Sequence, residues 1–136
     1  MNTSGNMAGS TANPKLVWAG RVITLLIALA FGMSAMMKFK GGPEFGEQSA
    51  KLGLPDSMRL PLAVLEITCV VVYLIPQTAV IGAILLTGYM GGAICTHLRI
   101  GDTFVVPHIV IALLLWLGIY LREPRLWALI PFRRTA

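Results

Sequence analysis

Charged residues are scarce in this 136-residue chain. They make up 12% of it, against about 25% in a typical soluble domain, while hydrophobic residues make up 56%. A soluble domain of this size has a large surface to cover with polar side chains, and 11 basic and 6 acidic residues are too few to cover it. The composition therefore excludes an ordinary soluble domain, and we expect much of the apolar surface to face lipid.

The motifs of soluble catalysis and of metal binding are also missing. The sequence has no glycine-rich phosphate loop, no HExxH motif and no serine in a nucleophile elbow. Its two cysteines, Cys69 and Cys95, lie inside apolar runs and form no CxxC motif, so we expect neither a disulfide framework nor a zinc knuckle. Glu66, His97 and His108 have no spacing diagnostic of a metal site, and we expect none. The basic residues behind the net charge of +5 form no stripe interleaved with aromatics, which argues against a nucleic-acid partner.

Four long apolar runs are the main feature that is present. They cover residues 16–37, 60–75, 79–96 and 104–121. A bilayer core of ~30 Å needs about 20 helical residues, and the first and fourth runs meet this requirement. The second and third runs are separated only by Pro76-Gln77-Thr78 and together are too long for one crossing, so the break predicts a helical hairpin. Because backbone groups in lipid must pair internally, we predict an all-α membrane protein, a four-helix transmembrane bundle.

The rest of the chain divides into a tail, loops and one short helix. Residues 1–14 are small, polar and uncharged, and we expect a disordered tail before a single domain over residues 15–136. In the long connection after the first run, residues 44–52 predict a short helix at the membrane surface, which Gly53 and Pro55 end.

The distribution of lysine and arginine indicates an orientation. Four crossings place both termini on one side, with slightly more basic residues there than on the other side. The first set is Lys15, Arg21, Arg122, Arg125, Arg133 and Arg134, and the second is Lys38, Lys40, Lys51, Arg59 and Arg99. This small excess favours cytoplasmic termini in a multi-pass protein of the cell membrane.

Glu66, a carboxylate inside the second run, is the sharpest feature of the sequence. An unpaired charge within a membrane helix costs roughly 3 kcal/mol. Antiparallel crossings bring the end of the first run, the end of the third and the start of the fourth to the same leaflet, so basic side chains can converge on the acid. These are Lys38, His97, Arg99 and His108. Nearby bases keep a buried carboxylate ionised, and two histidines near an acid resemble a proton relay. A purely structural polar cluster that sets helix register remains the alternative interpretation.

Small residues in the third run indicate close packing. Gly88 and Gly92 form a GxxxG pair, a spacing that lets another helix approach closely. We expect this face to pack within the chain's own bundle, with an oligomer contact as the alternative. Cys69 and Cys95 are at different depths in antiparallel helices, whereas a disulfide needs Cα atoms within ~7 Å, so we expect them to act as apolar filler.

Several short motifs occur together along the chain. They are Gly20-Arg21, Met37-Lys38-Phe39, LGLPDS at residues 52–57, the block from Pro61 to Asp102, and the ending LREPRLWALIPFRR. The block combines Glu66, the Ile75-Pro76 break, LLTGYMGGA and THLRIGD. On these motifs the chain, from about Trp18 to Arg134, resembles the DoxX-like family of small bacterial membrane proteins. The resemblance implies a four-helix protein of the bacterial inner membrane.

The resemblance also bears on function. Glu66, Thr96, His97 and Arg99 match recurrent polar positions of the family. Some relatives are linked to thiosulfate:quinone oxidoreduction or to membrane-associated oxidative-stress complexes, and many have no assigned activity. This implies a membrane subunit that binds a quinone or a small reductant near Glu66 and His97 and works with membrane or peripheral redox partner proteins. A non-catalytic scaffold or assembly factor and a small transporter are the alternatives, and whether the chain is itself an enzyme stays open.

Overall fold

The computed structural model describes residues 13–129, and over that range the chain contains helices and no strand. The elements in order are α1 (Pro14–Lys40), α2 (Pro43–Lys51), η1 (Asp56–Met58), α3 (Arg59–Leu74), α4 (Ala79–Arg99), α5 (Val106–Arg122) and η2 (Pro124–Ala128). The predicted all-α fold is confirmed. Most of the predicted tail, and the end of the predicted domain after residue 129, lie outside the described residues.

The first helix begins earlier than the sequence predicted. The side chain of Asn13 accepts a hydrogen bond from the backbone N–H of Lys15 at 3.0 Å and so caps α1. Pro14 occupies the first turn, where its missing N–H leaves no intrahelical bond unmade. Pro14 therefore belongs to the helix and not to the tail. At the other end α1 stops at Gly41, whose φ of 64° is left-handed.

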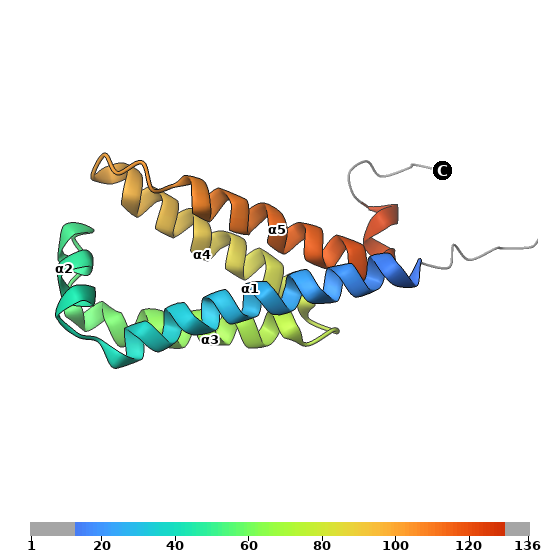
Figure 1. The fold of residues 1–136 in the computed structure, drawn as a ribbon, viewed down its shortest axis with the longest axis horizontal. Helices are drawn as coiled ribbons and strands as arrows, with labels where there is room; N and C mark the ends of the chain where they lie inside the picture. Colours follow the sequence, from blue (N-terminus) through green and yellow to red (C-terminus); the bar gives the residue numbers. More distant parts are fainter. Residues whose placement is uncertain (1–12, 130–136) are drawn as a thin grey trace, which may run out of the picture.

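Three segments are long and apolar enough to cross a membrane: α1, the continuous segment Asp56–Leu74 that consists of η1 and α3, and α4. The fourth apolar helix, α5, has 17 residues and spans only about 25 Å. It packs against α1 and α4 and so belongs to the same bundle (Figure 1). The chain is therefore a helical membrane protein with several apolar helices side by side.

The four long helices form a closed ring. α1 packs against α3 and α5, and α4 packs against the same two helices from the opposite side (Figure 1). Each of the long helices keeps an apolar face outside the ring. Trp18, Met33 and Leu113, for example, are 67%, 68% and 67% exposed. Such a surface suits acyl chains better than water.

The bundle is tightly packed at the end where α1 begins and α5 ends. A Cβ atom added to Gly82 of α4 would collide with backbone atoms of Tyr73 in α3. The buried hydroxyl of Tyr73 donates to the carbonyl of Leu115 at 2.8 Å, and Arg122 donates to the carbonyl of Tyr73 at 2.9 Å. Glycine at position 82 thus permits the close α3–α4 hairpin that the proline break predicted. We call this the closed end of the bundle.

At the opposite end the α4–α5 pair diverges from the α1–α3 pair, and α2 lies across the gap (Figure 1). The short helix predicted for residues 44–52 is thus present as α2. None of its residues is buried. We call this the hollow end, because a cavity opens there between the helices.

Candidate functional site

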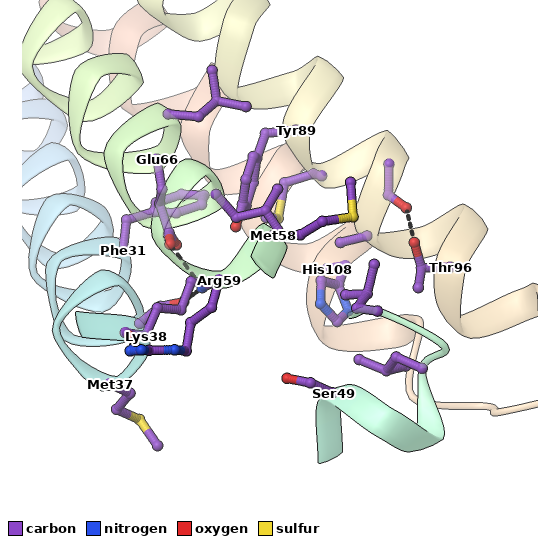
Figure 2. Close-up of a pocket in the computed structure, with 18 of the residues that line it drawn as sticks. Phe31, Met37, Lys38, Ser49, Met58, Arg59, Glu66, Tyr89, Thr96 and His108 are labelled. Atoms are coloured by element: carbon purple, nitrogen blue, oxygen red, sulfur yellow. Dashed lines mark hydrogen bonds and ion pairs between the residues drawn. The ribbon is translucent and has the colours of Figure 1, made fainter. Parts of the chain in front are cut away.

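The hollow end contains a cavity of about 750 Å³. All five α-helices contribute to its wall, and most of the lining is apolar (Figure 2). The polar side chains in the wall are Ser34, Lys38, Gln48, Ser49, Arg59, Glu66, Tyr89, Thr96, His97 and His108. A space of this size falls within the range of small-molecule binding sites.

Two glycines of α4 help to keep this space open. Gly88 and Gly92 line the cavity, and a Cβ added at either position would meet no atom within 4 Å. The expectation that this GxxxG pair packs against a helix of the same bundle is therefore wrong. The close approach in α4 occurs instead at Gly82, where the helices converge, because the pair at 88 and 92 lies where they diverge.

The strongest polar contact in the wall joins α1 to α3. The Nζ atom of Lys38 lies 2.8 Å from Oε2 of Glu66, and the Glu66 side chain is 1% exposed (Figure 2). Glu66 shares the inward face of α3 with the buried residues Ala63 and Val70, as helical periodicity requires. Lys38 is in the last turn of α1, where the helix dipole favours a cation, and it also donates to Ser34 at 2.6 Å. The buried acid is thus paired, as a carboxylate inside a membrane protein must be.

Arg59 supports this ion pair from the start of α3. Its guanidinium donates to the carbonyl oxygens of Lys38 and Phe39, the latter at 3.1 Å. These carbonyls belong to the last turn of α1, which lacks intrahelical partners for them. Arg59 therefore fixes the end of the helix that carries Lys38. The sequence offered no signal for this role beyond a cation near a helix start.

The two histidines form a second polar cluster in the wall. Nδ1 of His97 lies 2.9 Å from Oδ2 of Asp102, and Nδ1 of His108 lies 2.9 Å from the carbonyl oxygen of Phe104. The two imidazole rings are 4.9 Å apart between centroids. Carboxylate and carbonyl oxygens only accept, so each Nδ1 donates, and the Nε2 atom of each neutral ring is left as an acceptor.

Asp102 lies in the turn between α4 and α5, and its contacts favour the ionised form. The hydrogen bond from His97, followed by the one from the backbone N–H of Phe104, lowers the pKa of Asp102 below its ordinary value of 3.8. The N–H of Phe104 donates to Oδ1 at 3.0 Å while His97 uses Oδ2. One carboxylate thus holds both the turn and the orientation of the imidazole.

The other two predicted site residues are placed differently. Thr96 lines the cavity, but its hydroxyl donates to the carbonyl of Gly92 at 2.8 Å, within its own helix. Arg99 is not in the cavity wall, and it donates to the carbonyl of Leu52 at the end of α2, at 2.7 Å. The structure therefore does not bring Arg99 to Glu66, because its side chain points along the outer end of the bundle toward α2.

The predicted convergence on Glu66 is thus divided into two clusters. Lys38 touches the acid, while His97 and His108 share its cavity but make no hydrogen bond to it. Polar residues outside the predicted set also contribute: Ser34, Gln48, Ser49, Arg59 and Tyr89 line the cavity, and Asp102 orients His97. Only Asp102 had a readable signal, since it follows His97 by five positions across a helix end.

Aromatic side chains close the inner part of the cavity. Phe31 and Tyr89 meet edge to face with centroids 6.2 Å apart, and Tyr89 extends from α4 toward Glu66 in Figure 2. Cys69 is buried in the same wall, whereas Cys95 is exposed, and both thiols are free. In the part of the chain that the structure describes, no three histidine, cysteine or acidic side chains are grouped as metal ligands.

Fold and site together define a multi-pass helical membrane protein with an amphiphilic cavity at one end of its bundle. Residues 22–119 match the family model described as the DoxX-like family, and the chain belongs to that family. The matched region contains both polar clusters of the cavity. Comparison with curated proteins found no match, and neither did comparison with solved structures.

Proposed function

We propose that this chain is the membrane subunit of a redox system and binds the headgroup of a membrane quinone in the cavity at the hollow end. One observation carries the proposal: an apolar cavity among lipid-facing helices has the Lys38–Glu66 pair in one part of its wall and the His97–His108 pair in another. A quinone headgroup is a flat apolar ring with oxygens at opposite ends. It therefore requires an apolar space with polar groups in separate places.

The chemistry of the two clusters suits such a ring. The ammonium of Lys38 can donate to a carbonyl oxygen, and the histidine Nε2 atoms can accept from a hydroxyl group. Reduction of a quinone takes up two electrons and two protons. We assign the electrons to a redox partner protein and the binding of the headgroup to this chain.

Direct titration tests the proposal. Decylubiquinone is added to the purified protein in lipid nanodiscs, and quenching of the fluorescence of the three tryptophans reports binding. Gly92→Leu fills the cavity, and Gly91→Leu is its matched control: Gly91 has equally free space around a Cβ but is not part of the cavity wall.

We expect Gly92→Leu to weaken saturable binding at least tenfold, about 1.4 kcal/mol, and Gly91→Leu to leave it unchanged. Glu66→Gln should abolish binding while the helical circular dichroism signal is retained. If the wild-type protein shows no saturable quenching, or if both glycine variants bind like it, the quinone proposal is wrong. The scaffold and transporter hypotheses would then be the ones to pursue.

The orientation of the cavity is a separate proposal. The slight excess of lysine and arginine beside the termini supports cytoplasmic termini, and the hollow end then faces away from the cytoplasm. A single cysteine introduced as Ser57→Cys, in a chain without Cys69 and Cys95, should react with a membrane-impermeant maleimide on intact cells. Labelling only after cell lysis contradicts this orientation.

A further inference from the structure

The contacts of the two histidines determine which ring nitrogen is left for a ligand. Each Nδ1 atom donates to an oxygen of the α4–α5 turn, one to the carboxylate of Asp102 and one to the carbonyl of Phe104. Within residues 13–129 neither Nε2 atom has a hydrogen-bond partner. One part of the cavity wall therefore contains two acceptors of the same kind, on imidazole rings whose centroids are 4.9 Å apart.

His97 also separates the cavity from a groove beneath α2. It lines both spaces, and its side chain is 9% exposed. Asp102 lines the groove side, and its side chain is 40% exposed. The other ionisable groups that face His97 across the two spaces are Glu44, Glu47, Lys51, Lys38, Arg59 and Glu66. This set holds equal numbers of acids and bases.

We propose that the Nε2 atoms of His97 and His108 share the one proton of a ligand hydroxyl in a three-centre hydrogen bond, so that the cavity prefers the hydroquinone form of its ligand, and that Asp102 acts as a positioning residue for His97. The inference rests on the proposed function, and it names the redox form that binds. A quinone carbonyl has no proton to donate, so facing two acceptors it would leave them unpaired, and unpaired buried polar groups are costly. The proton of a hydroquinone hydroxyl can be shared between the two acceptors, which a quinone carbonyl cannot do.

The preference for hydroquinone should depend on pH. Protonation turns Nε2 from an acceptor into a donor, which then favours a carbonyl oxygen over a hydroxyl hydrogen. We therefore expect acid to remove the preference or to reverse it. The two His residues are the only ones in the chain, so both can be followed without overlap.

The experiment has two independent measurements. First, the protein is labelled with ¹⁵N-histidine, and NMR reports the protonated nitrogen of each ring, with His108→Leu to assign the signals. Second, dissociation constants for decylubiquinol and decylubiquinone are measured under argon at pH 8 and at pH 5. The variants are His108→Leu, Asp102→Asn and Asp102→Glu, and Cys95→Ala is the control because Cys95 is exposed on α4 outside the cavity.

We expect both neutral rings to carry the proton on Nδ1, and decylubiquinol to bind at least tenfold more tightly than decylubiquinone at pH 8. That ratio should fall to near one or invert at pH 5 and disappear in His108→Leu. Asp102→Asn should mix the tautomers of His97 and reduce the ratio, and Asp102→Glu should restore both. Cys95→Ala should behave like the wild-type protein.

Three results overturn the inference. If both redox forms bind equally at pH 8, or if the preference survives in His108→Leu, the histidines do not select the ligand, although the quinone proposal stands. If neither form binds, the proposed function fails and this inference fails with it, whatever tautomers the NMR spectrum shows.

Discussion

The two ends of α4 contain the same residue type and use it in opposite ways. At the closed end, the missing side chain of Gly82 lets the α3 backbone come into contact with α4. At the hollow end, the missing side chains of Gly88 and Gly92 face empty space in the cavity wall. A glycine in a membrane helix therefore marks either a close approach or a hollow, and its neighbours decide which.

The buried polar groups of the two ends differ in a parallel way. At the closed end, Tyr73 and Arg122 donate to backbone carbonyls across the α3–α5 contact, which ties these helices together, and Thr24 donates to the Gly20 carbonyl within α1. At the hollow end, Lys38 and Glu66 pair side chain to side chain in the wall of a cavity. The first arrangement only stabilises the bundle. The second keeps charged groups within reach of a ligand.

The largest effect should come from breaking the ion pair of the hollow end. Lys38→Met leaves the 1%-exposed carboxylate of Glu66 without its cation, and loss of one partner of a buried pair costs roughly 3–5 kcal/mol. The double variant Lys38→Met, Glu66→Gln should recover most of this loss. The measurement is the free energy of unfolding in a detergent–denaturant titration, arranged as a double-mutant cycle. Additive effects of the two substitutions would show that the pair is not coupled.

A smaller effect separates the two sets of glycines. Gly82→Ala places a methyl group against the backbone of α3 and should destabilise the protein by roughly 1–3 kcal/mol. Gly88→Ala meets free space, and alanine favours a helix over glycine by about 0.5–1 kcal/mol, so it should be neutral or slightly stabilising. Thermal melting of both variants in one detergent compares them directly. Equal melting temperatures would remove the distinction between the two ends.

The smallest effect concerns the turn that holds His97. Because the folded-state pKa of Asp102 is lowered, its contribution to stability is fully present above its unfolded pKa near 4 and is lost as the pH falls through the lowered value. The side chain is exposed enough that we expect only a small change. Melting temperatures of the wild-type protein and of Asp102→Asn should differ above about pH 4 and converge below it. A difference that grows on acidification contradicts this link.

The polar cluster was predictable only in part. Antiparallel crossings place Lys38, Glu66, His97 and His108 at the same end of the bundle, and the four side chains do line one cavity. Depth along a helix says nothing about the direction of a side chain, so the same reasoning included Arg99, which reaches α2 instead. The contacts of Arg59 and Ser34 depend on how α1 ends, which no spacing in the sequence reveals.

The sequence by itself determined that this protein is a bundle of apolar helices, because runs this long and this poor in charge can satisfy their backbone and their surface only as helices in lipid. It also determined that a carboxylate would need a partner inside that bundle. Only the tertiary structure decided that the helices converge at Gly82 and diverge at Gly88, and hence that a cavity exists. The physical reason is that the separation of two helices depends on the side chains of both, whereas each run of sequence specifies only the side chains of its own helix.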